Sequence, residues 1–462
     1  MKTIFITLPE TFIARNIFFT DFWPTFLELQ KENKIVILTK PEKEITYKEI
    51  FEKGNVEVVS IKFGSYGLWG KFVAWLAING IDTHTNEWEK MRARERGTGL
   101  IHTFIKHFYT KTFGNLPFWK DFIRKLFISI KPEKSLVDVF NKYNPDIVFL
   151  TSLTNYDFDI RVGTLAKQRK VFIVGMPRSW DNFTSHGLIR VVPDFLIVEN
   201  KYLFDLVNTT QNMHLKEDKL FISGLPHYDI YKKTTSPYVS REEFFQKLNI
   251  DQNKKLVLYG AMGDYFMHEG EIGKIFERLS KEGKIASDMH LLYRAHPRFE
   301  KQFEKMVNLS SVTPDSVAMH IGRDQAGKEI GEDDTKHLIN SILHSEFVIT
   351  SASTMAIDAT SLGKPVICVA YDLNIPNIRY WMSAKRFYDK YTHFEDLVST
   401  GGVKVVRNDD ELASAINSYT KNKDEDNEGR DKLLQTFVWP FDGKSSIRLA
   451  EKVSDIINQY GK

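Results

Sequence analysis

The sequence predicts an α/β fold built from two doubly wound, parallel-sheet domains. Short β-branched runs alternate with helical stretches in both halves of the chain, and a polar, Pro-containing segment at residues 232–237 separates the two alternating regions. Such alternation is typical of parallel sheets whose strands are joined by crossover helices. A length of 462 residues agrees with two or three domains.

Buried strands are expected first at residues 3–8, 35–38 and 56–61. The alternation resumes near residue 135, with strands at 146–150, 171–174, 195–198 and 220–223. Ligands of such sheets bind in the crevice at the carboxyl ends of the strands. Arg15 and Asn16 follow the first strand, and Asp157 follows the fourth, so they are candidates for this crevice. A solvated loop explains Arg15 and Asn16 equally well.

Residues 62–134 interrupt the alternation and form a predicted helical insertion. In residues 101–131 basic side chains interleave with aromatic ones, and the segment 114–117 divides the stretch into two amphipathic helices. Basic helices with an aromatic face suit the surface of an anionic membrane. The alternative is that the aromatic residues are core and the lysines are solvated. Nucleic-acid binding is not expected, because the net charge is only +3 and no groove-reading motif is present.

The loop at residues 175–187 follows a predicted strand and is rich in reactive side chains. Asp181 is the first candidate for a general base and His186 the second, because either side chain can accept a proton when its pKa lies near the working pH. Asn182 is a candidate contact to an acceptor. The alternative is a surface loop whose Asp and Asn residues only cap the backbone.

The second region places polar or glycine residues after three predicted strands of one sheet. The opening of a helix after a strand exposes unpaired N–H groups and the positive end of the helix dipole, which suits phosphate. We therefore expect a nucleotide-phosphate pocket at this edge of the sheet. Its candidate residues are Gly260 and Gly263 after the first strand, Arg294, His296 and Pro297 after the second, and Ser351, Ser353 and Thr354 after the third.

The residues of this second region resemble those of a known group of enzymes. His296-Pro297 and Ser353-Thr354 resemble the His-Pro and Ser/Thr-Ser pairs of the CDP-glycerol glycerophosphotransferases and the bacterial capsule sialyl- and Kdo-transferases, which have the GT-B fold. The resemblance implies two Rossmann-like domains facing a cleft. Residues 1–233 would bind the acceptor, residues 234–440 the nucleotide donor, and the helix in residues 441–462 would cross back to the first domain.

The resemblance implies an inverting glycosyltransferase that needs no metal or other cofactor. It would move a sugar or a glycerol-phosphate-like group from a CMP-, CDP- or UDP-linked donor to a surface polysaccharide, such as capsule, or to a lipid-linked acceptor. Residues 351–367 are also similar to the nucleotide-sugar site of UDP-N-acetylglucosamine 2-epimerases, but the Ser-Gly-Gly turn of that family is missing. An epimerase or hydrolase, or a non-catalytic protein that binds glycan or membrane, remains the alternative.

Composition and hydropathy set the expected compartment. The apolar run at the start of the chain is broken by Pro9 and Glu10, which is too early for a secretion signal. No run approaches the roughly 20 apolar residues of a membrane span. A cytoplasmic protein is expected, with contact to the inner face of the cytoplasmic membrane as an open possibility.

Overall fold

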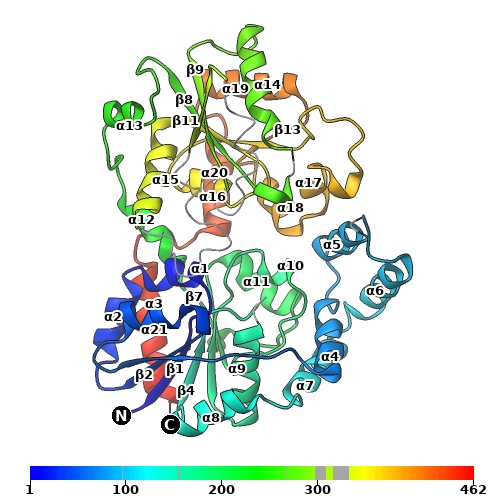
Figure 1. Ribbon diagram of the computed structural model, residues 1–462, viewed down its shortest axis with the longest axis vertical. Coiled ribbons are helices and arrows are strands. Elements are labelled where there is room, and N and C mark those ends of the chain that lie inside the picture. Colours follow the sequence, from blue (N-terminus) through cyan, green and yellow to red (C-terminus); the bar gives the residue numbers. More distant parts are fainter. Residues whose placement is uncertain (96, 155–156, 267, 297–308, 316–331, 462) are drawn as a thin grey trace. The chain divides into compact units, whose positions relative to one another are not determined.

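A computed structural model describes residues 1–95, 97–154, 157–266, 268–296, 309–315 and 332–461. The chain forms two compact units, unit 1 (Met1–Asp229 with Trp439–Lys462) and unit 2 (Ile230–Val438) (Figure 1). Each unit contains one sheet in which all pairings are parallel. The predicted α/β class with two parallel-sheet domains is therefore confirmed.

The sheet of unit 1 has the strand order β3-β2-β1-β4-β5-β6-β7. The first three strands run outward to one side of β1, and the chain then crosses to β4 on its other side. Such a reversal creates a crevice at the carboxyl ends of the strands. The strands are β1 (Thr3–Thr7), β2 (Lys34–Thr39), β3 (Val56–Ser60), β4 (Ile147–Leu150), β5 (Phe172–Gly175), β6 (Phe195–Val198) and β7 (Leu220–Ile222).

Helices cover both faces of this sheet, because successive side chains of a strand point to opposite faces. Ile4 and Ile6 of β1 join one hydrophobic cluster, and Phe5 between them joins the other. The helices and helical turns outside the insertion are α1 (Thr11–Ile13), η1 (Ala14–Phe18), α2 (Phe22–Leu29), η2 (Pro41–Lys43), α3 (Glu44–Phe51), α8 (Lys134–Tyr143), α9 (Asp157–Gln168), α10 (Asn182–Ser185), α11 (Lys201–Thr209), η3 (Glu217–Lys219), η4 (Pro226–Tyr228) and α21 (Ser445–Tyr460).

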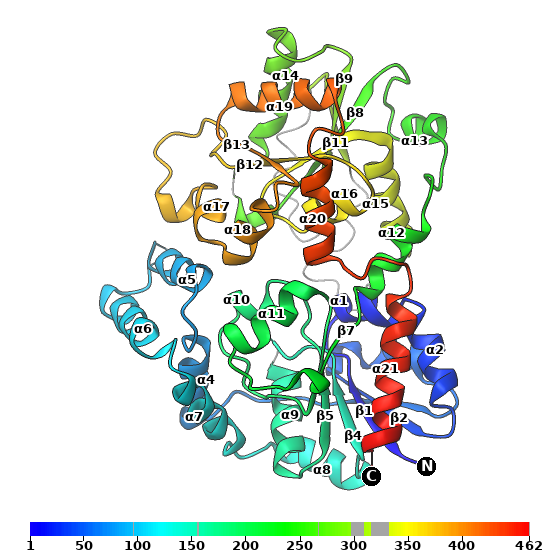
Figure 2. The same cartoon turned by 180° about the vertical axis from the view of Figure 1, so that it is seen from behind.

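The last helix, α21, belongs to unit 1 although the whole of unit 2 precedes it in the chain. Leu449 and Val453 pack into the same cluster as Ile4 and Ile6, and α21 lies beside α2 in both views (Figures 1 and 2). The Lys2 ammonium donates hydrogen bonds to the carbonyls of Ile457 and Gly461 at 2.9 and 2.7 Å. The expected return of the final helix to the first domain is confirmed.

The insertion consists of α4 (Leu68–Ile78), α5 (His84–Glu95), α6 (Leu100–Phe113) and α7 (Pro117–Ile128). Helix α6 ends and α7 begins around the Gly- and Pro-containing segment that predicted the division, with Pro117 as first residue of α7. Helix α7 packs on α4 and on α9, and α5 pairs with α6. No helix among the described residues is long and apolar enough to span a membrane.

The side chains of the insertion agree only in part with the alternative expected above, since Tyr109 and Phe127 are buried and Lys111 and Lys125 are exposed. Phe104 and Phe118 are 68% and 66% exposed, whereas Lys120 and Arg124 are only 4% and 5% exposed. Lys120 donates to the Thr210 carbonyl, and Arg124 donates to carbonyls of the segment 189–212. The expectation that the basic side chains face solvent is therefore wrong for Lys120 and Arg124, because these cations hold α7 to the body of unit 1.

Unit 2 has a six-stranded sheet with the order β10-β9-β8-β11-β12-β13. The strands are β8 (Lys255–Gly260), β9 (Met289–Arg294), β10 (Val312–Asp315), β11 (Ser345–Thr350), β12 (Val366–Val369) and β13 (Lys404–Val406). Its helices and turns are α12 (Asp229–Lys233), α13 (Arg241–Lys247), η5 (Gly263–Tyr265), α14 (Glu271–Lys281), α15 (Glu332–His344), α16 (Met355–Ser361), η8 (Tyr380–Met382), α17 (Arg386–Lys390), α18 (Thr392–Val398), α19 (Asp409–Lys421) and α20 (Asn427–Phe437).

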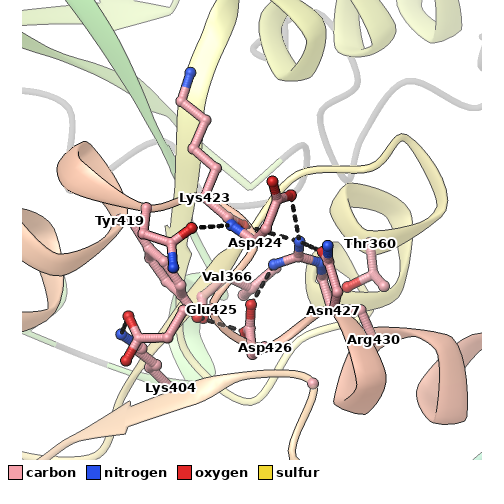
Figure 3. Close-up of polar contacts among 12 residues, drawn as sticks. Thr360, Val366, Lys404, Tyr419, Lys423, Asp424, Glu425, Asp426, Asn427 and Arg430 are labelled. Carbon is pink, nitrogen blue, oxygen red and sulfur yellow. Dashed lines mark hydrogen bonds and ion pairs between the residues drawn. The ribbon is translucent and has the colours of Figure 1, made fainter.

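The turn between α19 and α20 is closed by the buried side chain of Arg430 (Figure 3). Its guanidinium bonds the carboxylate of Asp426 and donates to the carbonyl of Lys423 at 2.9 Å. Tyr419 of α19 donates to the same Asp426 at 2.6 Å. These bonds fix α20 against the end of α19.

Candidate functional site

Gly260 ends β8 at the point where the sheet of unit 2 reverses direction. Thr350, at the end of the neighbouring strand β11, donates its hydroxyl to the Gly260 carbonyl at 2.7 Å. A Cβ added at Gly260 would lie 2.6 Å from Cγ of Met355, the first residue of α16. Glycine is therefore needed here because Met355 packs directly over the strand end.

The second predicted glycine, Gly263, lies in a turn that a buried carboxylate organises. Gly263 has a φ of +72°, a left-handed conformation that favours glycine. Glu269 accepts hydrogen bonds from the backbone N–H groups of Met262 and Gly263 at 2.7 and 2.5 Å. Because these two donors are already engaged, a phosphate beside this turn would take its hydrogen bonds from other groups.

The Ser351–Thr354 turn contains one structural and two accessible side chains. Ser351 is buried and donates its hydroxyl to the Val369 carbonyl at 2.8 Å. The Ser353 hydroxyl accepts from the Met355 N–H at 3.3 Å, so this residue caps the start of α16. Thr354 is exposed, and its side chain makes no capping bond. Ser353 and Thr354 are thus the members of this turn that a ligand can reach.

Arg294 and His296 follow β9, on the other side of β8. The Arg294 guanidinium donates to the fully buried Asp315 of β10 at 3.0 Å, and His337 Nε2 of α15 lies 3.0 Å from the same carboxylate. His296 comes two residues later and is half-buried. Pro297, the other predicted member of this group, lies outside the described residues.

In unit 1 the two candidates for the general base lie next to each other. Asp181 precedes α10, and its Oδ2 accepts from the Ser185 hydroxyl at 3.0 Å. His186 Nε2 lies 3.5 Å from the same Oδ2. A carboxylate beside an imidazole can orient the ring and stabilise its protonated form, which is the arrangement needed for proton transfer.

Asn182 is the residue that shapes this loop. It is fully buried, and its side-chain oxygen accepts from the Thr154 hydroxyl and from the N–H groups of Arg178 and Ser179. Its amide group donates to Asp181 at 3.1 Å. The predicted acceptor contact is thus a side chain whose polar atoms are used within the loop.

Glu199 lies beneath the same loop and was not singled out from the sequence. It follows β6, the neighbour of β5, and is only 4% exposed. Its carboxylate has no hydrogen-bond partner among the residues the structure describes. Burial, and to a smaller extent the charge of Asp181, raise the pKa of Glu199 to about 8, whereas Arg178 acts in the opposite direction. A charged residue directly after a buried strand was the one sequence signal for it.

Arg15 and Asn16 occupy a helical turn, η1, where a loop was expected. The Arg15 Nε donates to the Asn16 side chain at 2.8 Å, and η1 packs against η4. Burial, with the charge of Arg15 as a smaller cause, lowers the pKa of His227 in η4 well below its usual value. Arg15 and Asn16 therefore lie near a neutral histidine at the carboxyl edge of β1.

Both carboxylates of the Asp157-Phe158-Asp159 segment have partners within unit 1. Asp157 pairs with Arg190 at 3.3 Å, and Asp159 is fully buried, where it accepts hydrogen bonds from the Thr7 hydroxyl and the Ser152 N–H. Burial raises the pKa of Asp159 to about 7. Within the described ranges, no three His, Cys, Asp or Glu side chains are grouped as metal ligands.

Comparison with solved structures shows the same fold in other proteins. A putative UDP-N-acetylglucosamine 2-epimerase from Listeria monocytogenes is 14% identical, with a TM-score of 0.54 over 99% of this chain and 98% of the other. S. aureus MnaA in complex with UDP is also 14% identical, with a TM-score of 0.52 over 99% and 97%. The UDP-GlcNAc 2-epimerase from Neisseria meningitidis, bound to UDP-GlcNAc, is 15% identical, with a TM-score of 0.51 over 98% and 100%. These similarities support the predicted GT-B class and, at such low identity, nothing beyond the fold.

No curated protein matches the chain by sequence. One family model does: that of CDP-Glycerol:Poly(glycerophosphate) glycerophosphotransferase matches residues 178–455. The match includes the Asp181–His186 loop, all three strand ends of unit 2 and part of α21, and it covers more than half of the chain. It confirms the predicted class, a transferase that uses a nucleotide-activated donor. The chain belongs to the CDP-glycerol:poly(glycerophosphate) glycerophosphotransferase family.

Proposed function

We propose that the protein transfers a glycerol-phosphate or sugar group from a cytidine- or uridine-linked donor to a hydroxyl group of a bacterial surface polysaccharide or of its lipid-linked precursor. The observation that carries this proposal is the pair of accessible polar groups on either side of β8. His296 follows β9, and Ser353 and Thr354 follow β11. Neighbouring strands are about 4.8 Å apart and β8 lies between β9 and β11, so these groups follow strands that are about 10 Å apart at the same edge of the sheet.

On unit 2, His296, Ser353 and Thr354 would bind the donor's phosphates. Arg294 would add positive charge from beneath while its ion pair with Asp315 holds it in place. The backbone of Gly260 and Gly263 would shape the floor of the site, and Ser351 would fix the turn. Positively charged and hydrogen-bonding groups at this point stabilise the charge that develops on the leaving nucleotide.

On unit 1, Asp181 and His186 would activate the acceptor. The acceptor hydroxyl oxygen forms a bond to the activated centre of the donor, while the bond from that centre to the nucleotide phosphate breaks. The proton of the hydroxyl passes to the Asp181–His186 pair, and the leaving nucleotide takes the electron pair. Attack from the side opposite the leaving group gives inversion at that centre.

A thermal-shift series with CMP, CDP, UDP and GDP tests the donor site. A ligand present at 100 times its Kd stabilises the protein by about 2.7 kcal/mol. We expect a cytidine or uridine nucleotide to raise the Tm of the wild type and to have a much smaller effect on His296→Ala. His214→Ala, at an exposed position of unit 1, is the matched control and should keep the full shift. Equal shifts in both variants would remove His296 from the donor site.

Product analysis separates the transferase from its alternatives. With donor alone, a transferase gives only slow hydrolysis, whereas an epimerase converts the sugar and needs no acceptor. Loss of transfer in Asp181→Asn with unchanged nucleotide binding is the expected result. Unchanged transfer would assign the base to another residue, and the absence of any turnover would favour a binding protein.

We further propose that unit 1 contacts the inner face of an anionic membrane through the outer surface of the insertion. Large exposed apolar side chains gather there and nowhere else as densely among the described residues: Leu68, Trp69, Phe72, Leu100, Ile101, Phe104, Ile105, Phe108, Phe118 and Phe122. An exposed apolar surface of this kind marks a protein or membrane interface. Figures 1 and 2 show α4 to α7 grouped together at one side of the sheet of unit 1.

Vesicle sedimentation tests this contact. Phe104→Asp combined with Phe108→Asp should abolish sedimentation with phosphatidylcholine–phosphatidylglycerol vesicles, because each places a charge where an aromatic ring enters the lipid. Ile45→Asp, at an equally exposed apolar residue of α3, is the control and should sediment normally. Charge reversal at Lys120 or Arg124 is unsuitable, because these buried cations bind backbone carbonyls.

A further inference from the structure

Unit 1 contains a cavity of about 980 Å³ at the carboxyl edge of its sheet. One wall comes from residues that follow β2 and β3 and from the first turns of α9, and it includes Lys40, Lys62 and Arg161. Ile78 of α4 and Asn86 and Glu89 of α5 also line the cavity, as do His186 and Arg190. The cavity is large enough for a sugar or polyol phosphate, and it meets the candidate base at His186.

Four cations and three carboxylates line this cavity: Lys40, Lys62, Arg161 and Arg190, with Glu42, Glu89 and Asp157. Arg190 is only 7% exposed, and its hydrogen bond and ion pair within the described residues both join Nη1 to Asp157 at 3.3 Å, although a guanidinium carries five N–H donors. No carboxylate among those residues pairs with Lys62, which is exposed. A buried arginine with donors that no described residue accepts, and a lysine without a carboxylate partner among those residues, line the same cavity and can bind phosphate.

A second cavity of about 260 Å³ adjoins the first at Arg161, which lines both. It is mainly apolar, with Trp69, Phe127, Ile130 and Leu136 in its walls. Trp69 also belongs to the exposed apolar surface of the insertion. Arg161 is held at this boundary by Glu133, by the Gly64 carbonyl at 2.9 Å and by the ring of Tyr66 at 3.8 Å.

Shared residues connect four features of unit 1: Trp69 joins the exposed apolar surface to the apolar cavity, Arg161 joins that cavity to the larger one, and His186 lines the larger one. An amphiphilic molecule that rests in a membrane would meet them in this order. Its hydrocarbon chain would enter the apolar cavity, its phosphate would meet the arginines, and its terminal hydroxyl would reach the base.

We propose that the two cavities form the acceptor site, in which Arg190, Arg161 and Lys62 bind the phosphate of a lipid-linked acceptor and the apolar cavity holds the first part of its hydrocarbon chain. This inference rests on the proposed function, and it gives the acceptor a position in the fold. It also gives the insertion two roles: its outer surface would contact the membrane, and its inner surface would line the acceptor site.

Isothermal titration calorimetry of the full chain with two water-soluble probes tests the proposal. The probes are sn-glycerol 3-phosphate, which carries the phosphate alone, and monomeric dihexanoyl phosphatidylglycerol, which adds hydrocarbon. We expect both to bind, the lipid about tenfold more tightly. Arg190→Gln and Lys62→Gln should each weaken both probes about tenfold or more, since a hydrogen bond to a charged group contributes about 1.5–3 kcal/mol.

Two further variants locate the hydrocarbon chain and control for charge. Trp69→Ser should weaken the lipid probe and leave glycerol 3-phosphate unchanged. Arg169→Gln, at a unit 1 arginine outside both cavities, should leave both affinities unchanged. Lys62 is exposed, so its variant remains informative should Arg190→Gln fail to fold.

Unchanged affinities in Arg190→Gln and Lys62→Gln, or no binding of either probe, would overturn the acceptor site. Equal affinities for the two probes would overturn the lipid part and point to a water-soluble phosphate acceptor. The nucleotide thermal-shift series measures unit 2 independently. Nucleotide binding without phosphate binding would therefore reject this inference alone, and the reverse result would reject the proposed donor site.

Discussion

Replacement of Glu199 by glutamine tests the most unusual electrostatic feature of unit 1. Glu199 is buried without a hydrogen-bond partner among the described residues, and its pKa is raised from 4.5 to about 8. A carboxyl group whose folded pKa lies above its unfolded pKa is protonated in the native state over that interval. Its contribution to stability is therefore complete below about pH 4.5 and is lost as the pH rises toward 8.

The size of the effect follows from the shift of the pKa. Each pKa unit corresponds to about 1.4 kcal/mol, so a shift of this size makes the wild type up to about 5 kcal/mol less stable at high pH than a chain with a neutral group there. Glutamine is neutral at every pH and nearly isosteric. We therefore expect the unfolding free energy of Glu199→Gln, relative to that of the wild type, to increase by about 4 kcal/mol as the pH rises from about 5 to about 9.

Urea unfolding followed by tryptophan fluorescence measures this difference, because seven of the eight tryptophans lie in unit 1 and report its unfolding. Titrations of the wild type and of Glu199→Gln across that pH range give the difference directly. Glu217→Gln, at an exposed glutamate of the same unit, is the control and should follow the wild type throughout. A stability difference between Glu199→Gln and wild type that does not change with pH would refute the reasoning.

Three further predictions concern the donor half and the metal requirement. Arg294→Ala should lower the stability of unit 2 by about 3 kcal/mol in urea unfolding followed by circular dichroism, because it leaves the buried Asp315 with less compensation; an unchanged midpoint would contradict this. Gly260→Ala should cost about 1–3 kcal/mol through its clash with Met355, and Met355→Ala in the same chain should recover part of that loss; no recovery would place the strain elsewhere. EDTA should leave transfer activity intact, since Asp157 is engaged by Arg190 and Asp159 is buried; activity lost with EDTA and restored by Mg²⁺ would count against it.

The local residue pattern was sufficient to predict the strands and helices and their order along the chain. Strands appear as short apolar runs, and glycine or proline marks where they end, so β8, β9 and β11 could be placed together with the residues that follow them. The carboxyl edge of a parallel sheet is then a consequence of topology. That is why Gly260, His296 and Ser353 could be expected at one edge of one sheet.

The sequence could not tell which of these residues would be accessible. Ser351 and Asn182 have the same chemistry as their exposed neighbours, but both are buried and fully engaged in shaping their turns. Gly263 was expected in the nucleotide-phosphate pocket, but Glu269 occupies its N–H group together with that of Met262. Each of these outcomes depends on a partner whose position only the folded backbone defines.

By itself, therefore, the sequence determined the fold class and the alternation of strands and helices, because the periodicity of hydrophobic residues and the turn residues are local properties. The domain boundary and the site residues at the strand ends stay predictions. Only the tertiary structure decided the burial of charge. Arg124 looked like a surface cation, yet it is buried because carbonyls of Gln211 and Asn212 accept its hydrogen bonds. Glu199 follows an ordinary strand, and its raised pKa arises from burial and, to a smaller extent, from the charge of Asp181. The free energy of a buried charge is set by groups distant in the sequence, and no local pattern encodes them.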